Sequence, residues 1–349
     1  HLLDQAERRV RSASIAELGF GKWPIVLAFA ASYSAAAIKS LDADIDTVLA
    51  RTPSKARDGV ANFLSAKGKR ARSLWYSGLF DVWTKATAIR KQLSIGIDRD
   101  LPNGRNADIW LIVAGRQMCV ECTALTEDDE SCEVWDRFMQ EKMGGYEGVL
   151  RRPGPFCPPG AKGPSPYYNA LRVYAKVYDK LASTRLDPEQ SQFASCTPSA
   201  LLVSLSGPGV DPNAHGIDWA LDELFMVQPR WQPGPTSGTA RAASITLPSW
   251  LDFTAERLIA SRRLKRADYD ANRDRLLQAP RTIGGVLLFK DCELVAARMN
   301  YNALPEHRLT HAEMAKLETA FRRSTSYGSC PARSRKFLRR LQEAFDTGA

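Results

Sequence analysis

The stretch DIWLIVAGRQMCVECT, which runs from Asp108 to Thr123, decides both the fold and the candidate site. Two apolar runs flank the dipeptide Gly115-Arg116, a pattern typical of a β-hairpin with a two-residue turn. Such a turn places Asp108 opposite Thr123. Because side chains alternate between the two faces of a sheet, Glu121 then shares a face with Asp108 and lies diagonal to it.

The two carboxylates of this hairpin are candidate metal ligands. Diagonal neighbours are about 7–8 Å apart at Cα, close enough for Asp108 and Glu121 to bind one ion. Glu121 also stands within the apolar run MCVECTAL, where an unpaired charge is costly. A few hard oxygen ligands suit Mg²⁺, with Mn²⁺ as a substitute. The alternative is structural, with Asp108 capping the strand and Glu121 solvated on an edge strand.

The predicted helix at residues 167–182 carries two lysines that are candidate catalytic residues. Lys176 and Lys180 are one helical turn apart, so either ammonium can reach across the sheet toward the carboxylates. A cation there would stabilise charge that develops at phosphorus. Lysines of an amphipathic helix are ordinarily solvated, and this alternative stays open for both residues.

The rest of the chain alternates between helical and strand patterns. Apolar spacing predicts helices at 6–18, 24–39, 55–91, 217–225 and 251–277, strands at 93–98, 109–113, 118–125, 200–205, 283–289 and 294–299, and a basic helical tail at 310–345. This order predicts an α/β fold, a mixed β-sheet flanked by helices. We expect a helical N-terminal region at 1–91, a core at 92–305 and a basic helical C-terminal tail at 306–349.

Within residues 92–305 the chain resembles the PD-(D/E)XK nuclease superfamily, the restriction-endonuclease-like fold. The tetrapeptide NADI at 106–109 resembles its first acidic motif, and VECT at 120–123 resembles its second, where many members have Glu-x-Lys. Thr123 replaces that lysine. Some members place the lysine on the following helix, which would make Lys180 or Lys176 the substitute. The run NYNA at 300–303 is similar to an Asn-containing tail of some predicted members.

The resemblance implies hydrolysis of phosphodiester bonds. In such a nuclease Asp108 and Glu121 would hold Mg²⁺, and a helix lysine would stabilise the transition state. DNA is favoured over RNA as the substrate. Thr123 leaves a second interpretation, a catalytically inactive core that binds nucleic acid or a protein partner. That protein partner can also be a second copy of the chain, in a homo-oligomer. A small-molecule enzyme of another α/β type is the third alternative, and no cofactor motif supports it.

The charge of the chain favours polyanionic partners. The formal net charge is +9, from 48 lysines and arginines against 39 aspartates and glutamates. The basic side chains gather at residues 67–72, 262–266 and 333–340. Phosphate contacts release condensed counterions, so such groups predict nucleic-acid binding. Solvated helix faces remain the alternative for each group.

The remaining features bear on location and on other chemistries. Seven scattered cysteines favour a reducing, cytoplasmic compartment over a disulfide scaffold. The apolar segment 23–38 predicts a buried helix better than a secretory signal or a membrane span. The pair Cys119 and Cys122 has zinc-like spacing, but two residues three apart in a strand point to opposite faces. Few histidines are present, which disfavours a Ser or Cys triad.

Overall fold

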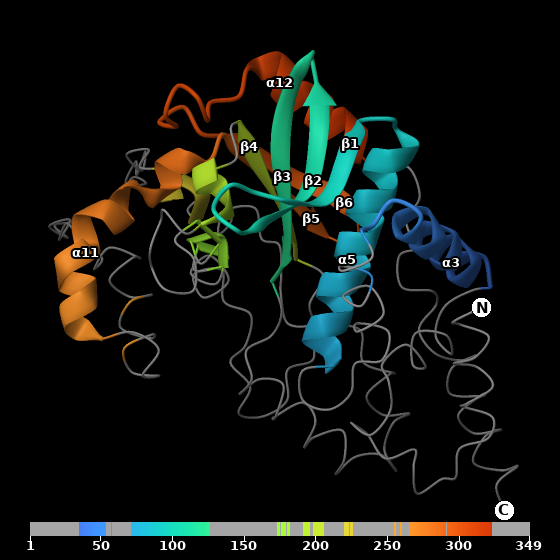
Figure 1. Cartoon of the computed structure of the whole chain (residues 1–349), viewed down its shortest axis with the longest axis horizontal. Coiled ribbons are helices and arrows are strands. Elements are labelled where there is room, and N and C mark those ends of the chain that lie inside the picture. The colour runs from blue at the N-terminus through green and yellow to red at the C-terminus, as the bar shows by residue number, and fades with distance from the viewer. Residues whose placement is uncertain are drawn as a thin grey trace, which may run out of the picture.

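Six strands form one sheet in the order β1-β2-β3-β4-β5-β6 (Figure 1). The computed structural model describes residues 35–53, 57, 71–125, 173–174, 176–178, 180–181, 191–195, 198–205, 220–222, 224–225, 255, 259, 265–290 and 292–322. The strands are β1 (Ser94–Asp100), β2 (Asn106–Val113), β3 (Arg116–Ala124), β4 (Ser199–Ser204), β5 (Gly285–Lys290) and β6 (Glu293–Met299). All six were expected from the sequence.

The sheet is mixed, as the sequence predicts. The β1/β2, β2/β3 and β5/β6 pairs are antiparallel, whereas the β3/β4 and β4/β5 pairs are parallel. Every residue of β4 is buried, because a central parallel strand has both faces covered. The mixed α/β architecture with helices on the sheet is confirmed.

Helices cover both faces of the sheet. The helices are α3 (Ala35–Leu49), α5 (Ala71–Arg90), α11 (Arg266–Gln278) and α12 (His311–Phe321), with short 3-10 turns at Gln192–Ser195 and Ala279–Thr282. Apolar side chains of α3, α5 and α12 pack in one cluster with Ile109, Val120 and Phe289 of the sheet. A second cluster, on the other face, joins Leu201 and Val203 to the helical residues within 173–181 and to α11. Figure 1 shows α3 and α5 on one side of the sheet and α11 on the other.

The turn of the β2–β3 hairpin differs from the expected one. Val113 pairs with Arg116, so the two turn residues are Ala114 and Gly115 and not Gly115-Arg116. Both turn residues have positive φ, +52° and +83°. This is the backbone requirement of a type I′ turn, whose twist matches that of the strands. Gly115 meets the requirement without strain because it lacks a Cβ.

Several helix predictions are also confirmed or corrected. Helical residues occur within 167–182, 217–225 and 251–277, as expected. The helix predicted to end at Lys39 instead continues to Leu49, because Leu41, Ile45 and Val48 recur at helical spacing and are all buried. The predicted helix 6–18, the stretch 127–166 and the tail beyond residue 322 lie outside the described residues.

The expected three-part division of the chain stays a prediction. Helix α5 precedes residue 92 and α12 follows residue 305, yet both share one hydrophobic cluster with the sheet. Helix α12 begins at a capping box, in which the Thr310 hydroxyl accepts from the Glu313 backbone N–H and the Glu313 carboxylate accepts from the Thr310 N–H.

The Asn-containing segment 300–303 has a structural role. The buried Asn300 side chain donates hydrogen bonds to the carbonyl oxygens of Pro280 and Ile283, at 2.8 and 2.9 Å. Asn302 donates to the carbonyl oxygen of Phe225 at 2.6 Å. These contacts join the end of β6 to the segment that leads into β5 and to the helical residues within 220–225.

Among the described residues, no helix combines the length and apolar character that a membrane crossing requires. Most of the apolar segment 23–38 lies outside the described residues, and only residues 35–38 belong to α3.

Loss of the Trp83 side chain should destabilise the fold strongly. Trp83 is fully buried, and its ring lies 5.8, 5.5 and 6.3 Å from those of Phe80, Phe289 and Phe321. We expect Trp83→Ala to lower the free energy of unfolding by about 3–5 kcal/mol in a urea titration. Leu74→Ala, at a half-exposed position of the same helix, should cost less than about 0.5 kcal/mol. Equal losses in the two variants would contradict this packing.

Candidate functional site

The strands β2 and β3 separate at the two carboxylates that the sequence singles out. Their backbone pairing runs from Val113/Arg116 to Ile109/Val120 and stops there. Beyond this point β3 pairs only with β4, and β2 pairs only with β1. The next pair in the register would be Asp108 and Glu121, so the two residues lie at the fork between the strands.

At this fork, hereafter the carboxylate fork, side chains replace the backbone partners of the ladder. The Asp108 N–H donates to Glu121 Oε1 at 3.1 Å, and the Cys122 N–H donates to Asp108 Oδ2 at 2.7 Å. Asp108 is therefore opposite Glu121, and the expected diagonal relation with Thr123 opposite Asp108 is wrong. The turn lies one residue earlier than expected, which shifts every cross-strand partner by two residues. A shift by two keeps each residue on its face, so the predicted proximity of the carboxylates survives.

A third carboxylate extends the fork onto β1. The pairs Ile97/Ile109 and Arg99/Ala107 flank Asp98 and place it opposite Asp108. Asp98 has a φ of +47°, in the left-handed region that few non-glycine residues adopt. Asp98, Asp108 and Glu121 thus form one row across three neighbouring strands. Asp98 was not among the expected site residues, because its strand has the ordinary alternating pattern of a β-strand.

Helix α5 adds a fourth carboxylate and a buried lysine. The Lys85 ammonium contacts Asp81 Oδ2 at 2.9 Å and Asp98 Oδ1 at 2.8 Å, and the lysine side chain is only 5% exposed. Burial acts to lower the pKa of Lys85, but the carboxylates, Asp81 first, outweigh it and hold that pKa above its usual range. The signal in the sequence was a charged pair at i,i+4, Asp81 and Lys85, in the central part of a helix whose other charged residues stand near its ends.

The carboxylate of Asp81 has an unusual protonation equilibrium. Burial raises the pKa of Asp81 to about 6, and the negative charge of Asp108 adds to this effect while Lys85 opposes it. The pKa of Asp98 is raised by burial as well. Several acids are thus gathered in a space that disfavours their charge, which is frequent at functional sites.

Glu121 is the most deeply buried acid of the fork. Its side chain is 0% exposed, and its Oε2 has no hydrogen-bond partner. Burial raises the pKa of Glu121 well above its ordinary value, as does the neighbouring Asp108. An unpartnered carboxylate oxygen in the interior is costly, and a bound cation would remove the cost.

The lysine nearest to this oxygen is Lys180. Its ammonium is 3.6 Å from Glu121 Oε2, and its side chain is 28% exposed, so it reaches both the fork and solvent. Burial acts to lower the pKa of Lys180, but Asp108 and Glu121 outweigh it and raise that pKa. Lys176 lies one turn earlier on the same helix and is half-buried. The structure thus brings Lys180 to the predicted acidic pair.

The donor set of the fork fits a hard divalent cation. Ligand atoms of Asp81, Asp108 and Cys122 lie within 4.8 Å of one another. The Cys122 thiol is 3.1 Å from the Thr84 hydroxyl, and burial raises its pKa well above the ordinary value, so it stays protonated. A protonated thiol is a poor ligand, whereas carboxylate oxygens suit Mg²⁺ or Mn²⁺.

Charge balance supports the same conclusion. Among the described residues at the fork, four carboxylates face two ammonium groups, which leaves a formal charge of −2 when all are ionised. One divalent cation would neutralise this charge. Asp108 and Glu121 are the pair best placed to hold it, because Glu121 Oε2 is buried and accepts no hydrogen bond from any described residue.

The two cysteines of the C-x-x-C sequence do not form a zinc site. Cys119 packs with Leu101 and Ala107, whereas Cys122 lies in the cluster on the α5 face, so they are on opposite faces as expected. Cys119 is disulfide-bonded, and Cys122 is a free thiol. A disulfide is at odds with a reducing compartment, and the cytoplasmic location stays a prediction.

The basic groups are only partly placed. Lys265 and Arg266, at the start of α11, are exposed, as a nucleic-acid contact requires. The groups at 67–72 and 333–340 lie wholly or mainly outside the described residues, so the nucleic-acid partner also stays a prediction.

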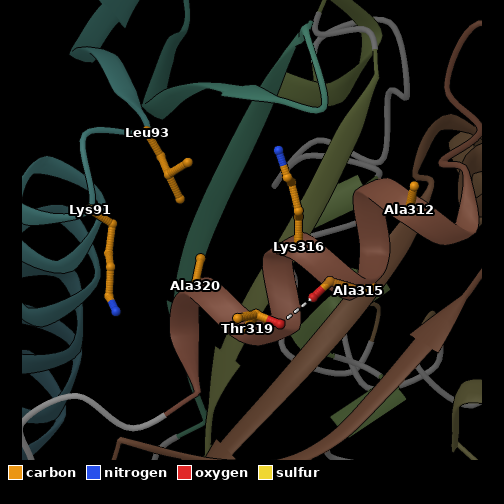
Figure 2. A pocket seen from close by; sticks show the side chains of 7 residues that line it. All are labelled: Lys91, Leu93, Ala312, Ala315, Lys316, Thr319 and Ala320. Atoms are coloured by element: carbon orange, nitrogen blue, oxygen red, sulfur yellow. Dashed lines mark hydrogen bonds between the residues drawn. The ribbon is translucent and has the colours of Figure 1, made fainter.

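An open groove of about 350 Å³ lies elsewhere, between the end of α5 and α12 (Figure 2). Its walls are formed by small and apolar residues and two lysines, namely Lys91, Leu93, Ala312, Ala315, Lys316, Thr319 and Ala320. The groove contains no acidic residue and none of the fork residues, so it is not the predicted metal site.

The chain matches no protein-family model, no curated protein and no solved structure. The chemistry of the fork is therefore inferred from its own geometry.

Protonation of the buried acids should stabilise the metal-free protein. Between pH 3.8 and about 6 the folded chain holds a proton on Asp81 that the unfolded chain has released. The free energy of unfolding should therefore rise as the pH falls from 8 to 5, by about 1–2 kcal/mol once the partial exposure of Asp81 is allowed for.

Urea titrations at several pH values, with a chelator present, measure this dependence. Asp81→Asn should flatten the rise, whereas Asp270→Asn, at an exposed position of α11, should leave it unchanged. A wild-type protein that loses stability steadily below pH 7 would show that the fork acids are not held in the protonated form.

Proposed function

We propose that this chain is a Mg²⁺-dependent nuclease, built on a restriction-endonuclease-like core, that hydrolyses phosphodiester bonds in DNA. The observation that carries the proposal is the buried Glu121 Oε2 beside Asp108, which accepts no hydrogen bond within the described part of the chain, in a site whose formal charge is −2 when its four acids are ionised. Metal-assisted hydrolysis needs carboxylates that hold a cation and a route to solvent. Asp108 and Glu121 are the carboxylates, and the partly exposed Lys180 marks the side of the fork that faces solvent.

The order of elements supports the nuclease-like core. Helix α5 is followed by three antiparallel strands, then by the helical residues within 173–181, and then by β4, which is parallel to β3. The resemblance implies a hairpin with two acids, a helix with lysine and a further strand. Both acids and the lysine occur in this order and meet at one place.

Each residue of the fork has a separate role in the proposed reaction. Asp108 and Glu121 would hold Mg²⁺, which when bound supplies a Lewis acid for the phosphate and lowers the pKa of a coordinated water. Lys180 provides a positive charge at the solvent-facing side, where its ammonium can contact a phosphate oxygen and stabilise developing charge. Thr123 is buried and carries no charge. We therefore assign the role of the lysine missing from the second motif to Lys180.

The rival proposal is an inactive core that binds nucleic acid or a protein partner. Thr123 favours it, because the position of the usual lysine has no cation. Calorimetry with Mn²⁺ separates the two proposals, since an inactive core need not retain a cation at Asp108 and Glu121. RNA in place of DNA is an outcome of the same cleavage assay with matched substrates.

Removal of either metal ligand should abolish cleavage. We expect Asp108→Ala and Glu121→Ala each to lower the rate of Mg²⁺-dependent DNA cleavage by at least about 100-fold and to weaken Mn²⁺ binding in calorimetry. Lys91→Ala, which removes an exposed lysine at the end of α5, is the matched control and should cleave normally. Full activity in both acid variants would overturn the proposal.

Removal of the Lys180 side chain should slow DNA cleavage and leave metal binding intact. We expect Lys180→Ala to slow cleavage on the order of 10²–10³-fold, since it removes one preorganised charge, while Mn²⁺ still binds. Lys176→Ala tests the other lysine of the helix in the same assay. A larger loss in Lys176→Ala than in Lys180→Ala would transfer the role to Lys176.

A further inference from the structure

Lys85 is a charged residue of the fork that the proposed hydrolysis does not use. Its ammonium bridges two carboxylates that come from different elements, Asp81 of α5 and Asp98 of β1. The lysine side chain is 5% exposed and Asp98 is 15% exposed, so water reaches this bridge mainly at Asp81, which is 30% exposed. A buried ammonium shared by two carboxylates needs both partners, because a lone buried charge is strongly destabilising.

The bridge has the arrangement of a second cation site. In two-metal phosphodiesterases, two ions about 3.5–4 Å apart are held among carboxylates, one of which they share. Here Asp108 lies next to Glu121 on β3 and opposite Asp98 on β1, and its carboxylate is within 4.8 Å of Asp81. Glu121 Oε2 accepts no hydrogen bond from the residues that the structure describes and lies 3.6 Å from the Lys180 ammonium. The Lys85 ammonium, in contrast, contacts both Asp81 and Asp98 at hydrogen-bond distance, 2.9 and 2.8 Å.

We propose that the Lys85 ammonium takes the place of a second divalent cation, so that the fork binds one metal ion and not two. A bound divalent ion requires ionised ligands, and one such ion at Asp108 and Glu121 brings the formal charge of the fully ionised fork to zero. A second ion at Asp81 and Asp98 would have to displace Lys85 into an apolar helix interface and would leave an excess of positive charge. Lys85 is therefore a tethered cation that restricts the stoichiometry of the site.

Removal of the Lys85 ammonium is therefore expected to create a metal site. Without the ammonium, Asp81 and Asp98 are two neighbouring carboxylates with no counter-ion from α5, and one ion at the other pair no longer neutralises the fork. The new site would carry the charge of two carboxylates and would open to solvent at Asp81, whose side chain is 30% exposed. The count of bound ions should rise by one.

The experiment counts bound Mn²⁺ by calorimetry and by electron paramagnetic resonance on the full chain. We expect one ion per chain in the wild type, two in Lys85→Ala, and one again in Lys85→Ala/Asp98→Asn. Lys91→Ala, a lysine six residues further along the chain and outside the fork, should bind one ion. A second readout is thermal: metal-free Lys85→Ala should lose about 5–10 °C in Tm, and excess Mn²⁺ should restore most of this loss.

The identity of the first metal site, at Asp108 and Glu121, rests on the proposed function. The rise in the number of bound ions on removal of Lys85 is tested independently of that function. A wild type that binds no ion would contradict the nuclease proposal, but a gain of one ion in Lys85→Ala would still support the role of Lys85. An unchanged count in Lys85→Ala, or two ions already in the wild type with one lost in Asp98→Asn, would overturn it. If the alanine variant does not fold, Lys85→Met retains most of the packed stem, ends one heavy atom earlier, and is scored by the same count.

Discussion

The replacement of backbone pairing by carboxylates between β2 and β3 is the constraint on which the described structure depends most. Two backbone N–H groups at the carboxylate fork, those of Asp108 and Cys122, donate to side-chain oxygens and not to carbonyl groups of the facing strand. Unpaired N–H groups in the interior are strongly disfavoured, so the strands can separate here because two carboxylates accept the hydrogen bonds that the facing strand does not. The opening of the sheet and the candidate site are therefore one feature.

Charge enters the fork from both faces of the sheet. Lys85 comes from α5, which packs on one face, and Lys180 comes from the helix that packs on the other. Each lysine contacts a different end of the acidic row, Asp98 for Lys85 and Glu121 for Lys180. Burial alone would favour neutral acids, and the two ammonium groups limit this effect without cancelling the excess of negative charge. The excess of negative charge lies close to Glu121 Oε2, which accepts no hydrogen bond from a described residue, and a bound cation would compensate both.

Much of the site could be predicted because its first two members lie on one hairpin. Moving the turn by one residue shifts the cross-strand partners by two residues, which is an even number. Side chains alternate with a period of two, so Asp108 and Glu121 kept their shared face although the turn was misplaced. The true turn could not be chosen from the sequence, since Ala114-Gly115 lacks the Asn or Asp that marks most type I′ turns. The sequence narrowed the candidate catalytic lysine to Lys176 or Lys180 and could not choose between them, because the two lie one turn apart on the same predicted helix.

The sequence by itself determined the strands, the mixed sheet, the shared face of Asp108 and Glu121 and a short choice of lysines. These follow from periodicities of two and 3.6 residues, which are local properties of the chain. Only the tertiary structure decided that Asp98 faces Asp108, that Lys85 joins α5 to β1, and that Lys180 rather than its neighbour reaches Glu121. Those relations depend on how a helix packs and turns about its axis against the sheet. This packing reflects the whole of both hydrophobic clusters, and no short pattern of residues encodes it.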